Sequence, residues 1–154
     1  MNLIEFEQSS HASLLEFFCK YGINTTTNFD LMDIADDLEL PLKVLMKDEL
    51  KEKHIEKEIP LIINYQNSNQ KGIHWVGYYL GNYFDSYGLP PLKQLEKHVV
   101  EYNKIDFQSN TDLTYCGQLT LYVLWKLYMN VKFNNIARSG VKSLLEELNY
   151  FLKK

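Results

Sequence analysis

The sequence predicts an α+β protein in which a small central sheet, mostly antiparallel or mixed, is packed between helices. Apolar residues recur at helical spacing near both ends of the chain, whereas the middle holds short apolar runs of strand length. A chain of 154 residues is long enough for one compact core and too short for two ordinary domains. We therefore expect a single domain over residues 1–154.

Two helices are expected before the strands. The first spans residues 11–21 and ends at Gly22, and the second begins with Asn28 as its N-cap. The second helix carries apolar residues at helical spacing, namely Leu31, Ile34, Ala35 and Leu38. Residues 41–58 are mixed in character, and we expect a connector there with one exposed, charged helical turn.

The expected strands follow in the middle of the chain. The apolar run at residues 59–66 predicts a buried strand, and residues 72–91, "GIHWVGYYLGNYFDSYGLPP", predict a short hairpin. Residues 92–103 predict a surface helix whose inward side chains are Leu92, Leu95, Val99 and Val100. A further short strand is expected over residues 104–108.

Two more helices are expected towards the end of the chain. The segment "CGQLTLYVLWKLYMN" follows a polar loop and is apolar on nearly all sides, which predicts a buried central helix beginning at Cys116. Residues 139–154 have a single apolar face, which predicts an amphipathic helix.

Composition and charge narrow the functional classes. The formal net charge is −4 and no cluster of Lys or Arg stands out, which weighs against a DNA-binding face. No stretch reaches the roughly 18 consecutive apolar residues of a membrane span, and no signal-peptide pattern begins the chain. We therefore expect neither a membrane partner nor secretion. Two cysteines, Cys19 and Cys116, indicate no metal site or other cofactor, and Cys19 is expected in the core.

Three residues together offer nucleophilic chemistry. Cys116 lies where a polar loop meets a helix, and the unpaired N–H groups of a helix N-terminus stabilise a thiolate. His74 can serve as base to this thiol, and Asp85 can orient the imidazole. Gly117 would let a substrate backbone approach closely. Each residue also has an ordinary interpretation: a small buried thiol, a histidine bonded to backbone at a strand end, and a carboxylate that initiates a turn.

The predicted hairpin places His74 and Asp85 on one face of the sheet. Their separation is odd, and an odd separation across a turn of even length leaves both side chains on the same side. Direct opposition would centre the turn on residues 79–80, whereas the turn-prone Gly and Asn stand at 81–82. A bulge or a skewed pairing is therefore expected.

Two polar side chains are candidates for binding the substrate. Gln108 lies in the loop before Cys116, where its amide and the Cys116 backbone N–H could form an oxyanion hole. An ordinary polar loop residue is the alternative interpretation. Asn64, on the strand before the hairpin, is a weaker candidate for lining a substrate cleft.

These residues resemble a known family in their order and their surroundings. The segments "IINYQNSNQKGIHW", "YFDSYGLPPLKQL", "FQSNTDLTYCGQLTLYVL" and "VLMKDEL" are similar to blocks of the adenovirus-type maturation cysteine proteases (adenain). The similarity is greatest to relatives in virophages and Polinton/Maverick-type elements, and the ubiquitin-like-protein-specific proteases are more distant cousins. It covers residues 28–130 of the chain.

The resemblance implies a cysteine protease fold with His74 as base, Asp85 as orienting acid, Cys116 as nucleophile and Gln108 in the oxyanion hole. Trp75 would pack beside the catalytic residues. The implied reaction is hydrolysis of peptide bonds in viral capsid or core precursor proteins during virion maturation, with small residues, notably Gly, flanking the cleaved bond. The implied location is the host cell cytoplasm or viral factory, and the virion itself.

The chain also departs from adenain. Asp85 stands where adenain has Glu, the interval from His74 to Asp85 is shorter, and the interval from Gln108 to Cys116 is one residue longer. Adenain is activated by a peptide joined through a cysteine and by DNA. Here the spare cysteine, Cys19, lies outside the similar region, so we expect neither activator. Two alternatives stay open: a deubiquitinating or deSUMOylating protease, and a catalytically silent protease-like binding domain.

Overall fold

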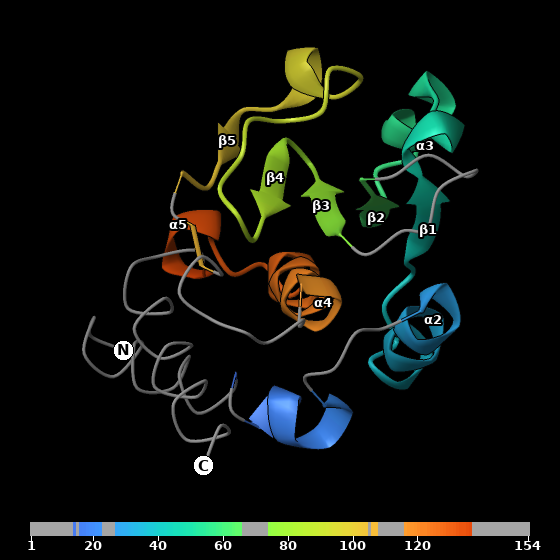
Figure 1. Ribbon diagram of the computed structural model, residues 1–154, viewed down its shortest axis with the longest axis vertical. Helices are drawn as coiled ribbons and strands as arrows, with labels where there is room; N and C mark the ends of the chain where they lie inside the picture. Colours follow the sequence, from blue (N-terminus) through green and yellow to red (C-terminus); the bar gives the residue numbers. More distant parts are fainter. Residues whose placement is uncertain are drawn as a thin grey trace.

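The computed structural model describes residues 14, 16–22, 27–65, 74–104, 106–107 and 116–136. They form an α+β arrangement on a mixed five-stranded sheet of order β1-β2-β3-β4-β5 (Figure 1). The strands are β1 (Lys43–Met46), β2 (Leu61–Asn64), β3 (Trp75–Tyr79), β4 (Asn82–Asp85) and β5 (Glu101–Tyr102). The three central strands pair antiparallel, and each outer strand pairs parallel to its neighbour. The predicted fold class is confirmed at this level.

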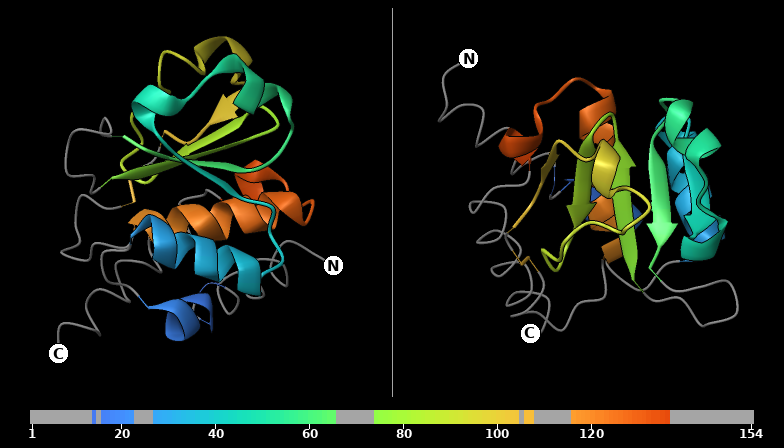
Figure 2. Two further views of the ribbon diagram at one scale, coloured as in Figure 1. Left: turned by 90° about the vertical axis from the view of Figure 1, so that its right-hand side faces the viewer. Right: turned by 90° about the horizontal axis from the view of Figure 1, so that it is seen from above.

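Helices cover both faces of the sheet. The left view of Figure 2 shows α2 and α4 on one side and α3 on the other. The α-helices are α2 (Asn28–Asp37), α3 (Glu52–Glu56), α4 (Cys116–Tyr128) and α5 (Phe133–Ile136), and the 3-10 helices are η1 (Lys47–Glu49) and η2 (Glu96–His98). This arrangement buries the central strands on both faces, and β2 is accordingly apolar along its run "LII" rather than alternating.

The helix α4 is the centre of the larger buried cluster. Every residue of α4 from Cys116 to Leu124 is buried, which confirms the predicted central helix. The cluster on this face of the sheet also holds Ile62, Trp75 and Phe84, one from each central strand. A second cluster on the opposite face is built from the alternate strand positions, Leu61, Ile63, Val76, Tyr78 and Tyr83.

The hairpin forms with regular pairing. Val76 lies opposite Asp85, and Tyr79 lies opposite Asn82, so the two-residue turn is Leu80–Gly81. Both turn residues have positive φ, 45° and 85°, as a type I′ turn requires. Of the two expected alternatives, the bulge is absent and the skewed pairing is present: the turn lies one residue before the expected Gly and Asn, and Asp85 pairs with Val76 rather than with His74.

The connector over residues 41–58 contains a strand that the sequence did not reveal. β1 pairs parallel with β2, matching Lys43 with Leu61 and Met46 with Asn64. Only Leu45 of its four residues is buried, so the segment shows no alternating pattern to predict it. The expected helical turn is present as α3, where Ile55 is buried.

Residues 92–103 do not form the expected surface helix. Only the single 3-10 turn η2 is helical, and Val100, expected to face inward, is 89% exposed. The backbone N–H of Val100 donates instead to the carbonyl of Gly81 at 2.7 Å, and β5 follows as a parallel edge strand beside β4. The strand expected over residues 104–108 thus lies earlier, at Glu101–Tyr102.

Smaller differences concern the helix ends. The N-cap of α2 is Thr27, whose hydroxyl accepts the N–H of Asp30, rather than Asn28. Residues 16–21 are helical and Gly22 ends them with φ of 85°, as expected. Cys19 is exposed, so its expected place in the core is wrong. The helix expected over residues 139–154 lies outside the described residues.

Candidate active site

The structure brings His74 and Asp85 together at one end of the hairpin. His74 immediately precedes β3, and Asp85 ends β4 opposite Val76, so the two side chains are diagonal neighbours across the strand pair. The ring Nε2 lies 2.9 Å from the Asp85 Oδ1. The Asp85 side chain is fully buried and that of His74 is 12% exposed, so water competes little for this bond.

Asp85 also initiates the turn that follows it. Its Oδ1 accepts the backbone N–H of Tyr87 at 2.8 Å, and its carbonyl accepts the N–H of Gly88 at 2.8 Å. The turn requires a positive φ of 70° at Gly88, and glycine adopts it readily because it has no Cβ. The two interpretations of Asp85 are therefore compatible, since one carboxylate both bonds the histidine and shapes the turn.

Cys116 acts on the same imidazole. It is the first described residue of α4 and is buried, and α4 packs across β3, the strand that His74 precedes. Its thiol is close enough to act with Asp85 in raising the pKa of His74. Asp85 bonds Nε2, whereas the other ring nitrogen, Nδ1, is buried and has no hydrogen bond among the described residues. Nδ1 is therefore the ring nitrogen that remains available to the thiol.

Electrostatics favour a charged imidazole at neutral pH. Burial disfavours the imidazolium and lowers the pKa of His74, but hydrogen bonds and charges from Asp85 and Cys116 outweigh it and raise the pKa to about 9. A protonated His74 beside the thiol stabilises a thiolate, which is the nucleophilic form of cysteine. The arrangement can therefore hold an imidazolium–thiolate pair, with Asp85 balancing the positive charge.

Two aromatic rings flank His74, and the sequence analysis did not single them out. The ring centroids of Tyr87 and Tyr65 lie 4.9 Å and 5.8 Å from that of the imidazole. Tyr87 is partly open to solvent, so its ring forms an accessible wall beside the histidine. The turn signal in "DSYG" could have pointed to Tyr87, because a turn-initiating Asp commonly accepts the N–H two residues on.

The other expected site residues have varied positions. Trp75 is buried in the same cluster as Cys116, and its carbonyl accepts the Thr120 hydroxyl at 3.3 Å. Gly117 is buried in the first turn of α4 that the structure describes. Asn64 ends β2 opposite Trp75 and is buried, which leaves little of its side chain open to a substrate. Gln108 lies outside the described residues.

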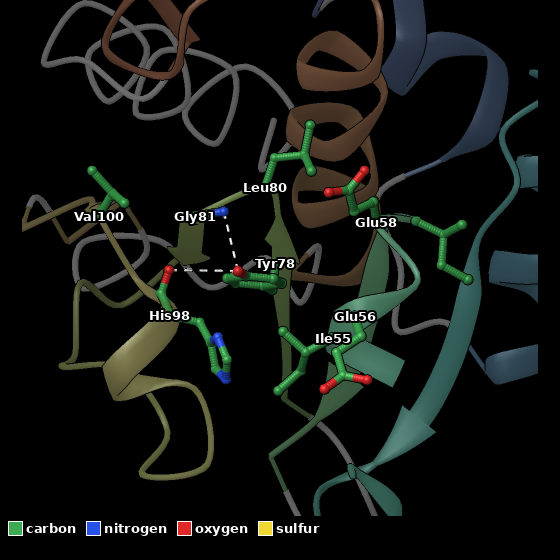
Figure 3. A pocket seen from close by; sticks show the side chains of 9 residues that line it. Ile55, Glu56, Glu58, Tyr78, Leu80, Gly81, His98 and Val100 are labelled. Carbon is green, nitrogen blue, oxygen red and sulfur yellow. Dashed lines mark hydrogen bonds between the residues drawn. The ribbon is translucent and has the colours of Figure 1, made fainter. Parts of the chain in front are cut away.

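A pocket lies at the other end of the hairpin. It has a volume of about 490 Å³ and is formed around the Leu80–Gly81 turn (Figure 3). Its lining residues are Ile55, Glu56, Glu58, Ile59, Tyr78, Leu80, Gly81, His98 and Val100. None of the expected catalytic residues is among them, so this pocket is not where Cys116 would act.

The described residues were also compared with the patterns of a metal site and of a membrane-spanning helix. Within them, no group of three or more His, Cys, Asp or Glu side chains is arranged to hold a metal ion. No helix in that part of the chain is both long and apolar enough to cross a membrane.

No protein-family model matches the chain, and searches of curated proteins and of solved structures give no match either. The chemistry of the site is inferred below from the geometry of His74, Asp85 and Cys116 and from the resemblance of the segments that contain them.

Proposed function

We propose that the protein is a cysteine endopeptidase that uses Cys116, His74 and Asp85 as its catalytic triad. One observation carries the proposal: a single buried imidazole bonds a carboxylate at 2.9 Å through Nε2 and also interacts with a cysteine thiol. These residues come from the start of β3, the end of β4 and α4, so the fold assembles them from separate elements. A nucleophile, a base and a group that orients the base are the parts that covalent peptide hydrolysis needs.

The reaction begins with the thiolate of Cys116 attacking the scissile carbonyl carbon. The carbonyl oxygen becomes an oxyanion, for which Gln108 and backbone N–H groups would serve as donors. The imidazolium of His74 then gives its proton to the leaving amine, and the C–N bond breaks to leave a thioester. Neutral His74 removes a proton from water, which attacks the thioester and releases the carboxylic acid product and the Cys116 thiolate, and this restores the imidazolium–thiolate pair.

The proposed substrates are viral capsid or core precursor proteins, cleaved during virion maturation beside small residues, notably Gly. The resemblance to adenain and its virophage relatives supports this choice. We propose that neither DNA nor an activating peptide is needed and that the enzyme works in infected cells and virions. A protease for ubiquitin-like conjugates is the second candidate, because that wider group shares the order of His74, Trp75, Asp85, Gln108 and Cys116.

Selective alkylation of Cys116 is the first test. The purified protein is treated with iodoacetamide at mildly acidic pH, and mass spectrometry locates the adduct. Ordinary thiols are protonated there and react slowly, so rapid labelling is expected at the buried Cys116 and not at the exposed Cys19. His74→Ala should abolish this selectivity. Equal slow labelling of both cysteines, unaffected by His74→Ala, would mean that the thiol is not activated.

Cleavage assays then distinguish the two substrate classes. One set of fluorogenic peptides carries Gly on both sides of the bond to be cleaved, and the other substrates are ubiquitin and SUMO fused to a reporter. We expect turnover of the peptides, its loss in Cys116→Ala and its retention in Cys19→Ala. Turnover confined to the ubiquitin-like fusions would favour the second candidate. A labelled but inactive wild-type protein would favour a binding domain.

A further inference from the structure

The short edge strand β5 continues beyond its backbone pairing through a side chain. The backbone pairs of β4 and β5 are Asn82 with Glu101 and Tyr83 with Tyr102, and there they end. At the next residue, Asn103, the side-chain Oδ1 accepts the backbone N–H of Asp85 at 3.0 Å. Its Nδ2 donates to the carbonyl of Asp85 at 2.6 Å. The amide thus holds both backbone polar groups of one residue.

Only a carboxamide satisfies both groups at once. The Asn side chain offers one acceptor and one donor in a plane, as a peptide group does, and so takes the place of a partner strand. Asp could accept but not donate, and an apolar side chain could do neither. Asn103 is 4% exposed, so its loss would leave the buried N–H of Asp85 without this partner, whereas the Asp85 carbonyl would keep the N–H of Gly88.

This clamp acts on the residue that carries the acid. An Asp side chain has only two rotatable bonds, so the position of its backbone largely fixes where its oxygens lie. In Asp85, Oδ1 meets both the His74 ring and the Tyr87 N–H, whereas the buried Oδ2 has no hydrogen bond among the described residues. The direction of the carboxylate thus depends on a well-placed backbone as well as on these two bonds to one oxygen.

We propose that Asn103 is a positioning residue of the candidate active site: by clamping the backbone of Asp85 it sets the carboxylate against Nε2 of His74. Asn103 itself touches neither His74 nor the thiol in any bond described above. Its effect on catalysis rests on the proposed protease function, but its effect on His74 does not. No pattern in the sequence points to Asn103, because it lies 18 positions after Asp85.

The test follows the titration of His74 by NMR in ¹⁵N-histidine-labelled protein, with His74→Gln to assign the signal. Asn103→Ala is compared with the wild type, and Asn103→Ser serves as a second variant that can keep one of the two bonds at a time. Asn82→Ala is the matched control, because Asn82 also bonds backbone from β4, donating to the Tyr79 carbonyl at 3.3 Å, at the far end of the hairpin.

With the clamp lost, the pKa of His74 should fall from about 9 by about one unit or more towards its ordinary value. The control Asn82→Ala should leave it unchanged. If the wild type cleaves peptides, kcat should fall about a hundredfold in Asn103→Ala with little change in KM, because the loss is one of geometry. Asn103→Ser should lie between Asn103→Ala and the wild type in both measurements.

A folded Asn103→Ala protein with the wild-type pKa at His74 would overturn the proposal. If Asn103→Ala does not fold, an unchanged pKa in folded Asn103→Ser does the same. Failure of both variants to fold would assign Asn103 to folding rather than to positioning, and would also overturn it. A wild type that cleaves nothing would count against the protease function alone, since the titration needs no turnover.

Discussion

At Asp85, one oxygen atom accepts both the ring of His74 at 2.9 Å and the N–H of Tyr87 at 2.8 Å. The sequence predicted two separate roles for Asp85, one as the partner of His74 and the other as the residue that initiates a turn. It could not show that both bonds are made, because that depends on a diagonal register which places Asp85 opposite Val76. Residue types and their order thus predicted the chemistry of this site, and backbone geometry supplied its arrangement.

The raised pKa of His74 predicts how hydrolysis depends on pH. The imidazole is protonated below about 9, and the imidazolium is the acid that protonates the leaving amine. We therefore expect kcat/KM for a peptide amide to fall as the pH rises through about 9. Alkylation of Cys116 by iodoacetamide needs a thiolate but no acid, so its rate should not fall over the same range.

Asp85→Asn tests whether the titration of His74 causes this fall of kcat/KM at alkaline pH. Without the carboxylate the imidazolium loses the negative charge bonded to it, so the pKa of His74 should fall. The decrease of kcat/KM should then occur at lower pH. By analogy with the serine triad, the rate should fall by about four powers of ten. A decrease of kcat/KM that stays near pH 9 in Asp85→Asn would mean that another group titrates there.

At the scale of elements, the sequence predicted those helices and strands whose signals lie within a single stretch of the chain. The hairpin has two strand-length runs, α2 has apolar residues at helical spacing and α4 is apolar on nearly all sides, and each of these signals lies in consecutive residues. Both parallel edge strands escaped prediction, since β1 and β5 contain four and two residues and depend on partners elsewhere in the chain. Val99 and Val100 fit a helical spacing equally well until β4 is placed beside them.

The contact between β3 and α4 depends on Gly77. A Cβ at this position would lie 2.8 Å from the Thr120 Cγ2 and 3.1 Å from the Leu124 Cγ. Gly77→Ala should therefore lower the free energy of unfolding by about 1–3 kcal/mol through overpacking. Because β3 continues from His74 and α4 carries Cys116, separating them should also slow the alkylation of Cys116. Urea unfolding and the labelling rate measure the two effects.

Thr120→Ser tests whether this contact is the cause. The change removes Cγ2 and keeps the hydroxyl that donates to the Trp75 carbonyl. Combined with Gly77→Ala, it should restore part of the lost stability and labelling rate, the rest being due to Leu124. A double variant no better than Gly77→Ala would exclude Thr120 as the obstacle, and Thr120→Ser alone shows the effect of the methyl group.

On the scale of the whole molecule, two buried clusters lie on opposite faces of the sheet. The candidate triad comes from the residue before β3, the last residue of β4 and the first residue of α4. Apolar patterning predicted that such layers exist, because each face of the central strands must be covered. It could not predict their order in the sheet. The site is therefore a property of the assembled chain, and its charges should contribute to the stability of the whole.

His74 should make global stability decrease as the pH rises. Its pKa increases on folding from the ordinary 6.5 to about 9, so the folded state binds the proton more tightly. The contribution is complete below about pH 6.5, declines between there and about 9, and is absent above. A shift of this size corresponds to about 3 kcal/mol, of which the Asp85 interaction supplies a part.

The measurement compares urea unfolding of Cys116→Ala with that of Cys116→Ala/His74→Gln from neutral to alkaline pH. The Cys116→Ala background removes the thiol, which also raises the pKa of His74, and taking the difference cancels other groups that titrate in both proteins. The difference in the free energy of unfolding should shrink as the pH rises, because the single variant loses what the Asp85 carboxylate gives to a protonated His74. A difference that is constant with pH would mean that the pKa of His74 does not change on folding. The Asp85–His74 bond would then not stabilise the folded chain as an ion pair.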